Sequence, residues 1–392
     1  MRLVLAAVAA ALAAPAAVDE SDFRWERMVQ APSQGFATFV ADGPLFAHAK
    51  PELADLRVVD SDGRQVPWRR LPDPAPRASK EVELLNAGVQ GGAFVGLLDL
   101  GPTRAVRNRA ELVMANERDF VGRVTVFGSD DRRRFTRLST TKVFDLRGAT
   151  AATSTTLVFP PTDHRFLQLR GVGVPLPVAA RVYNAPRRPA LGPVESDVSI
   201  EQRERATHVG LDVGYERLPV DLVRISTTTP RFDRPVVISG SNGERVFRVL
   251  QRGRILRREG VVQLDVPVDA AHRMLSVVIR NGDDAPLRSL RVEARARPRA
   301  VVLAEGSAPP FRLLYGNGSA RAPTYDFARL SARELMPIVA GQLGAERENP
   351  DWEPPEDTRS FLERNPRVVE GSLALVAIAL GIGGFFALRR RA

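Results

Sequence analysis

Short runs of alternating apolar and polar residues fill most of this chain. Apolar residues recur two positions apart, as at Val124 and Val126 or at Val236 and Ile238. This is the spacing of a strand that buries one face. Glycine, proline, asparagine and aspartate separate the runs, and these residues favour turns. The pattern therefore predicts an all-β protein.

The same strand pattern occurs twice. The stretch RVTVFGSDDRRRF at residues 123–135 has a counterpart, PVVISGSNGERVF, at residues 235–247. Matches kept in the same order are Leu98-Asp99-Leu100-Gly101 with Leu211-Asp212-Val213-Gly214 and His164-Arg165 with His272-Arg273. Self-similarity in a fixed order indicates a duplicated domain, and we place the two copies at residues 86–186 and 205–298.

Each copy offers about seven or eight short strands, which is typical of an antiparallel β-sandwich. The LDLG-like strand, the V-x-V-x-G-S-x-[DN] hairpin and the H-R-[FM]-L strand together resemble the galactose-binding-like jelly rolls of discoidin-type and carbohydrate-binding modules. We expect an all-β fold of two tandem jelly-roll-like β-sandwiches, with additional flanking β elements and one C-terminal transmembrane helix.

The N-terminal segment has the pattern of a secretory signal. Residues 1–17 carry one charge, at Arg2, followed by a run of alanine, leucine and valine. Small residues before the acidic Asp19 suit cleavage after Ala16 or Ala17. We expect a cleaved signal peptide over residues 1–17, and an uncleaved anchor is the alternative.

The C-terminal segment has the pattern of a membrane span. Residues 371–388 contain no charged residue, and three arginines follow them directly. An apolar run of this length with a basic flank predicts a transmembrane helix, placed at 368–389, with residues 390–392 in the cytoplasm. Ala377 and Gly381 lie four residues apart, so they are possible packing positions for another transmembrane helix.

Four further segments lie outside the two copies. Residues 18–85 predict an N-terminal β region, residues 187–204 a linker, and residues 299–330 a membrane-proximal β segment. Residues 331–367 predict a short helix, begun by a capping box at Ser331, and a proline-rich stalk. Whether residues 18–85 and 299–330 form one domain is left open by the sequence.

The whole layout carries a second resemblance. A DLRV hairpin that ends in Val-Pro at residues 55–67, an LLYGN element at residues 313–317 and the two apolar ends resemble an uncharacterised family of bacterial periplasmic single-pass envelope proteins. The resemblance implies an inner-membrane anchor, a periplasmic body, a cytoplasmic C-terminus and an integral inner-membrane partner. It implies no activity.

Composition removes several classes of function. The net charge of +10 comes mostly from arginines that are scattered among 46 acidic residues, whereas nucleic-acid recognition needs basic charge gathered on one face. No nucleic-acid partner is therefore expected. The chain contains no cysteine, which excludes disulfides, thiolate metal sites and cysteine nucleophiles.

Candidate chemistry is sparse. The four histidines, His48, His164, His208 and His272, have no metal-ligand spacing, and two of them recur at one place in the repeat, which favours a role in the fold. Asp130 and Asp131 suit calcium, but Asn242-Gly243 takes their place in the second copy, so a turn explains both copies. We predict no catalytic residues, no metal site and no cofactor.

Glycan binding is the sharper alternative that the repeats suggest. Sugars stack on exposed aromatic rings beside polar groups, and all three tryptophans lie outside the repeats. Trp25 and Trp68 of the N-terminal region are the candidate glycan contacts. An enzyme ranks third, because it requires a cleft that gathers residues such as Asp99, Asp212 and the histidines.

The leading hypothesis is a non-enzymatic, membrane-anchored periplasmic scaffold of the cell envelope, associated with an integral-membrane partner. The alternative is a glycan-binding accessory subunit of a polysaccharide synthesis or export complex, whose ligand is an envelope polysaccharide.

Overall fold

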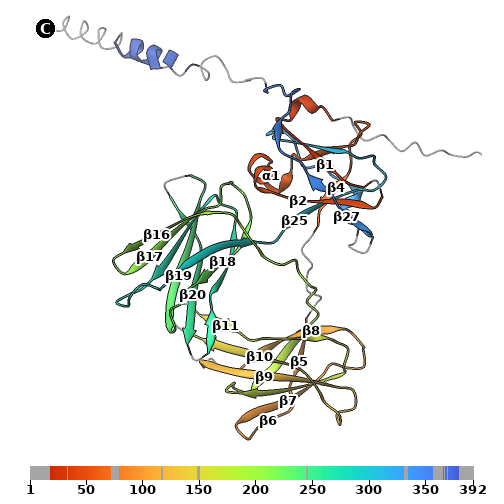
Figure 1. Cartoon of the computed structure of the whole chain (residues 1–392), viewed down its shortest axis with the longest axis vertical. Coiled ribbons are helices and arrows are strands. Elements are labelled where there is room, and N and C mark those ends of the chain that lie inside the picture. Colours follow the sequence, from red (N-terminus) through yellow and green to blue (C-terminus); the bar gives the residue numbers. More distant parts are fainter. Residues whose placement is uncertain are drawn as a thin grey trace, which may run out of the picture.

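The computed structural model describes most of the chain between residues 18 and 378. The described residues are 18–32, 34–71, 79–115, 118–147, 151–243, 246–258, 260–330, 334–355, 365, 367–368 and 370–378. Their regular structure is almost entirely β-strand, as the alternating pattern predicts, and Figure 1 shows three β bodies in one chain. The expected signal peptide, residues 1–17, lies outside the described residues.

The first sandwich consists of two antiparallel sheets. The larger sheet has the order β11-β10-β9-β13-β7-β6, and the smaller has the order β12-β8-β14-β5. Phe94, Leu112 and Leu167 are among the apolar side chains buried between them. The strands are β5 (Lys80–Glu83), β6 (Leu85–Gln90), β7 (Ala93–Asp99), β8 (Arg107–Met114), β9 (Phe120–Ser129), β10 (Thr136–Leu146), β11 (Ala152–Ser154), β12 (Thr156–Thr162), β13 (Phe166–Val172) and β14 (Pro177–Tyr183).

The second sandwich repeats this plan. Its larger sheet has the order β16-β17-β23-β19-β20-β21, and its smaller sheet has the order β15-β24-β18-β22. Val209, Ile238 and Leu275 lie in the core between the sheets. The strands are β15 (Gly192–Pro193), β16 (Asp197–Arg203), β17 (Ala206–Asp212), β18 (Val220–Ser226), β19 (Phe232–Ser241), β20 (Arg248–Arg258), β21 (Val261–Gln263), β22 (Asp265–Ala270), β23 (Met274–Arg280) and β24 (Arg291–Ala296).

The two sandwiches correspond strand for strand. Each strand from β5 to β14 has a counterpart whose label is ten higher, and the two strands hold equivalent places in the corresponding sheets of the two sandwiches. Each copy therefore has ten strands among its described residues, more than the seven or eight that the sequence predicts. The predicted linker at residues 187–204 is also wrong for β15 and β16, because these strands pair with β24 and β17 and complete the second sandwich.

A third body, here called the terminal domain, packs a five-stranded sheet on a four-stranded one. The sheets have the orders β28-β1-β26-β3, with β29 also on β1, and β27-β2-β25-β4. The strands are β1 (Trp25–Gln30), β2 (Phe36–Ala41), β3 (Arg57–Val59), β4 (Trp68–Arg70), β25 (Arg299–Leu303), β26 (Phe311–Tyr315), β27 (Ile338–Ala340), β28 (Gln342–Leu343) and β29 (Arg347–Glu348). The helices are η1 (Glu20–Asp22), α1 (Gly43–His48), η2 (Pro51–Leu53) and η3 (Asp326–Arg329).

The terminal domain answers the question that the sequence left open. β1 pairs with β26, and β2 pairs with β25, so the segments before and after the sandwiches share one core. The predicted helix and stalk at 331–367 are wrong for residues 338–348, which add β27, β28 and β29 to this domain. Residues 331–333 lie outside the described residues, and residues 334–337 form turns and bends.

The C-terminal segment begins as helix. Residues 367–368 and 370–378 are helical, and Ala377 is exposed there. Among the described residues, no helix combines the length and apolar character needed to cross a membrane. The remainder of the expected span, including Gly381, lies outside the described residues.

The composite core of the terminal domain generates a stability prediction. Leu313 of β26 is fully buried, so Leu313→Ala should lower the free energy of unfolding by about 2–5 kcal/mol. The tryptophans lie in or beside this domain, at Trp25, Trp68 and Trp352. Urea unfolding followed by tryptophan fluorescence should therefore detect the loss. Leu275→Ala, in the second sandwich, is the matched control, and an equal shift from both variants would contradict separate cores.

Candidate functional site

Equivalent hairpins of the two sandwiches meet in one apolar contact. β10 and β11 of the first sandwich contact β20 and β21 of the second, and Figure 1 shows β10 and β11 at the end of the second sandwich where β20 lies. The buried cluster between them consists of Phe144, Leu146, Ala152, Leu256 and Val261. Phe144 and Leu256 are 112 residues apart and hold the same repeat position (256 − 144 = 112). The contact therefore has the self-complementary character of a two-fold dimer interface, built within one chain.

Cations reinforce this contact from both sides. Lys142 of β10 donates to the carbonyl of Gly260 in the second sandwich. Arg254, which holds the same position on β20 (254 − 142 = 112), donates to the carbonyl of Arg147 in the first sandwich at 3.1 Å. Each cation thus satisfies a backbone carbonyl of the other copy, so the two sandwiches are fastened by polar as well as apolar contacts.

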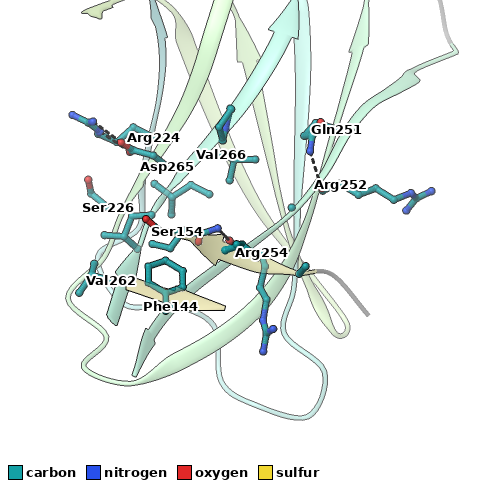
Figure 2. A pocket seen from close by; sticks show the side chains of 17 residues that line it. Phe144, Ser154, Arg224, Ser226, Gln251, Arg252, Arg254, Val262, Asp265 and Val266 are labelled. Carbon is teal, nitrogen blue, oxygen red and sulfur yellow. Dashed lines mark hydrogen bonds and ion pairs between the residues drawn. The ribbon is translucent and has the colours of Figure 1, made fainter. Parts of the chain in front are cut away.

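A cleft of about 690 Å³ opens beside this contact. The second sandwich contributes most of its wall, and β10 and β11 of the first sandwich close one side (Figure 2). The lining residues are Phe144, Ala151, Thr153, Ser154, Arg224, Ile225, Ser226, Gln251, Arg252, Gly253, Arg254, Val262, Gln263, Leu264, Asp265, Val266 and Pro267. A concave site between two domains is a common position for a ligand.

An ion pair organises the second-sandwich wall of the cleft. Arg224 of β18 binds Asp265 of β22 in a bidentate pair, with N–O distances of 2.7 and 2.6 Å. The hydrogen bond to Asp265 raises the pKa of the Arg224 guanidinium. Both side chains are about 40% exposed, at 39% and 41%. The pair therefore presents fixed donors and acceptors to solvent at the cleft.

The lining also holds two further arginines, Arg252 and Arg254, beside several uncharged polar groups. The Gln263 side chain donates to the Arg254 carbonyl at 2.9 Å, and the Gln251 side chain donates to the Arg252 carbonyl at 2.8 Å. Ser154 and Ser226 add hydroxyl groups to the lining. Amide and hydroxyl groups can both donate and accept, and guanidinium groups donate, so this surface suits a hydroxyl-rich ligand.

The recurring Asp and His-Arg motifs serve the fold. Arg165 binds Asp99 in a bidentate pair at 3.1 Å, and Arg273 binds Asp212 at 3.0 and 3.1 Å. Each pair ties the start of β13 or β23 to the end of β7 or β17. The hydrogen bond from Arg165, helped by the Gly101 backbone N–H, lowers the pKa of Asp99 to about 2. The structure thus places Asp99 and Asp212 in separate structural pairs, one in each sandwich.

The repeated turn is attached to the same strand. Asp130 accepts the backbone N–H of Arg165 at 3.3 Å, and its other oxygen lies 3.0 Å from His164 Nδ1. In the second copy, Asn242 accepts the backbone N–H of Arg273 at 3.0 Å. The turn therefore docks onto the entry of the His-Arg strand in both copies.

Metal-binding groups do not gather in the part of the chain that the structure describes. No cluster of three or more histidine, aspartate or glutamate side chains has the geometry of a metal site there. Asp131 accepts the backbone N–H groups of Arg133 and Arg134 at 2.8 and 2.9 Å. Its oxygen thus holds the turn by hydrogen bonds to the backbone.

The two tryptophans predicted to contact a glycan have different surroundings. Trp68 is only 8% exposed, and its indole N–H donates to the Leu56 carbonyl at 3.1 Å, so its ring is part of the core. Trp25 is half-buried and stacks on His48 with 4.5 Å between ring centroids. The Arg24 guanidinium lies 5.1 Å from the Trp25 ring and 5.0 Å from the Trp352 ring. Trp25 thus belongs to a surface aromatic cluster of the terminal domain.

A polar network lies beneath this aromatic cluster. His48 Nδ1 lies 2.9 Å from Glu346, and the buried Tyr315 hydroxyl donates to the same carboxylate at 2.7 Å. Burial and the hydrogen bond to Glu346 raise the pKa of the Tyr315 phenol far above its ordinary value. Tyr315 therefore stays protonated and acts as a donor that holds the chain after β28 on the domain.

The sequence pattern did not identify the residues that line the cleft. Arg224 and Asp265 are 41 residues apart, and their pairing depends on the register of β18 on β22. One signal was present, since the repeat alignment places an apolar residue at both Phe144 and Leu256. That alignment does not show that these positions face each other.

The Asp99 pair generates a prediction about pH. Its folded pKa lies below the ordinary 3.8, so its contribution to stability is present above that value and is lost as the pH falls toward about 2. Asp99→Asn should therefore lower stability at pH 7 by up to about 1 kcal/mol, the range for a solvent-screened pair. Urea unfolding should show a smaller difference from wild type at pH 3.

A matched control uses the exposed Asp326, which is 97% exposed beside Arg329. Asp326→Asn should have little effect at either pH, because exposed pairs contribute little. An Asp99→Asn deficit that grows on acidification would contradict the structural role of the pair.

No protein-family model matches the chain, and no curated protein matches it. Several solved structures do match. A glycoside hydrolase 29 family member from an unknown rumen bacterium is 13% identical over 53% of this chain and 40% of its own, with a TM-score of 0.21. This chain therefore spans less than half the length of that protein.

Two further solved structures match over most of their own length. The CBM32-1 and CBM32-2 domains from Clostridium perfringens ZmpB in complex with GalNAc are 8% identical, over 71% of this chain and 98% of theirs, with a TM-score of 0.23. Allantoicase is 11% identical, over 60% of this chain and 92% of its own, with a TM-score of 0.18. TM-scores this low carry no argument about the fold, which is established by the strand pairing within this chain.

Proposed function

We propose that this protein is a non-enzymatic, membrane-anchored interaction protein of the bacterial envelope. In this proposal the terminal domain is a base beside the inner membrane, the two sandwiches form a periplasmic arm, and the partner is an integral inner-membrane protein. The observation that carries the proposal is that the segments before and after the sandwiches build the base together, so the sandwiches are inserted between them.

The segment that leads to the expected anchor supports this arrangement, because it is integrated into the base. β28 and β29 both pair with β1. The Asn349 side chain donates to the carbonyls of Glu20 and Phe23 at 2.8 and 2.9 Å. A membrane helix after this segment would therefore be attached close to a folded domain.

Contacts between the second sandwich and the base also support the proposal. Arg217 donates to the carbonyl of Phe46 at 3.0 Å and to that of Ala47. The Tyr215 ring packs so closely on Gly43 that a Cβ added there would lie 2.2 Å from it. A small hollow of about 420 Å³ remains beside these contacts. The arm is thus held on the base by side-chain contacts as well as by the connecting chain.

Affinity purification tests the proposed partner. The full chain, purified from detergent-solubilised membranes, should bring down a stoichiometric integral-membrane protein. An unrelated single-pass periplasmic protein, purified in the same way, controls for co-purification through the detergent micelle. Repeated recovery of the chain alone would overturn the proposal.

A second candidate function is that of a glycan-binding accessory subunit of a polysaccharide synthesis or export complex. The cleft between the sandwiches favours it, because about 690 Å³ of space is lined by serine hydroxyls, glutamine amides, the Arg224–Asp265 pair and two further arginines. Sugar hydroxyls both donate and accept hydrogen bonds, and a site with fixed polar groups orients them. The proposed ligand is an envelope polysaccharide.

Polysaccharide pull-down with variants of the full chain tests whether a glycan binds in the cleft or at the aromatic cluster. Arg224→Ala removes charged donors from the cleft and should weaken glycan binding roughly tenfold, the effect of losing a hydrogen bond to a charged group. Gln251→Ala supplies a second cleft variant with an exposed side chain. Trp25→Ala should leave binding unchanged, and a loss in this variant alone would move the site to the terminal domain. No binding of the wild type at millimolar glycan would exclude this function.

A further inference from the structure

The edge strand β16 of the second sandwich pairs with its neighbour without a bulge. β16 is the last strand of the six-stranded sheet, so one side of its backbone has no partner strand among the described residues. It pairs with β17 at all seven positions, from Asp197 to Arg203, without a register shift. All seven residues are exposed, and Val198 and Ile200 are apolar. Such an edge is a ready template for another strand.

The first sandwich provides an internal comparison, because its corresponding edge is interrupted. The register of β6 on β7 shifts between Leu85 and Gly88, and Asn86 has a φ of 49°. Bulges and twisted edges are devices that block strand addition. One copy of the duplicated domain therefore disrupts this edge, whereas the other copy leaves it regular.

The residue order of β16 is complementary to itself. When two copies pair antiparallel around a two-fold axis at Ile200, position i faces position 400 − i. Asp197 then faces Arg203 of the second copy, twice by symmetry, and Ile200 faces Ile200. We propose that the protein associates with a second copy of itself through this pairing of β16, which joins the two six-stranded sheets across the contact.

The neighbouring symmetric registers are less favourable. Centring the pair on Ser199 places Asp197 opposite Glu201, and centring it on Glu201 places two glutamates opposite each other. Like charges that face each other across strands are destabilising. The register centred on Ile200 is also the one that pairs all seven residues. The facing charges and the number of paired residues thus select the same register. They also favour a second copy of this chain as the partner of β16.

Cysteine cross-linking tests the register directly, because the chain has no cysteine of its own. In the full chain in isolated membranes, Ile200→Cys should form a disulfide-linked dimer on mild oxidation, since facing residues have Cα atoms about 4.5–5.5 Å apart. Val198→Cys and Gln202→Cys should not link to their own copies, because four positions along a strand span roughly 13 Å. Membranes that contain both variants should give the mixed dimer, since positions 198 and 202 face each other.

Charge exchange provides a second test. Asp197→Arg or Arg203→Asp places like charges opposite each other at both ends of the contact and should weaken dimer formation roughly tenfold or more. The double variant, Asp197→Arg with Arg203→Asp, should restore it. Recovery in the double variant would exclude misfolding as the cause of the single-variant losses.

Three results would overturn the proposal. One is an Ile200→Cys dimer yield no higher than that of Val89→Cys, the matched control on the edge strand β6, where Val89 is 72% exposed. Another is equal linkage at positions 198, 200 and 202, which would indicate random collision. The third is a double charge variant that stays monomeric. The proposed membrane partner is tested separately, so failure of the dimer leaves that proposal intact.

Discussion

Phe144 and Leu256 hold the same position in two copies of one domain and meet in a single apolar cluster. The relative placement of the two sandwiches depends on this contact, which Lys142 and Arg254 reinforce through backbone carbonyls of the opposite copy. Because the cleft is bounded by both sandwiches, its shape depends on the contact too. A duplicated domain that packs on itself obtains a self-complementary interface from one surface. Because both sides of the interface come from this surface, a change to it in either copy alters the contact.

The terminal domain applies a different constraint to the chain. Its strands come from the segments before and after the sandwiches, so the core forms only when the two ends of a long insertion meet. Loop-closure entropy rises slowly with loop length, and the shared apolar core offsets it. The later segment is also tied directly to the earlier one, because the Asn349 side chain donates to the Phe23 carbonyl.

Comparison of the two copies separates structural motifs from candidate sites. The Asp99–Arg165 and Asp212–Arg273 pairs occur in both copies and fasten equivalent strands. The cleft and the exposed edge occur where the copies differ. At the start of β22, Asp265 pairs with Arg224, whereas at the start of β12 a threonine, Thr156, faces Glu111. The recurring motifs were the easiest features to find in the sequence, and they proved to be structural.

The sequence alone determined the β class, the duplication and the role of the repeated turn as a bend. These depend on local periodicity and turn residues, such as Asn242-Gly243, which act within a few positions of the chain. It did not determine β16, because a strand exposed on both faces lacks a buried face to mark it. Nor did it determine that Trp68 is buried or that Arg224 meets Asp265. Those outcomes depend on which strands become neighbours across tens or hundreds of residues, and only the packing of the sheets decides that.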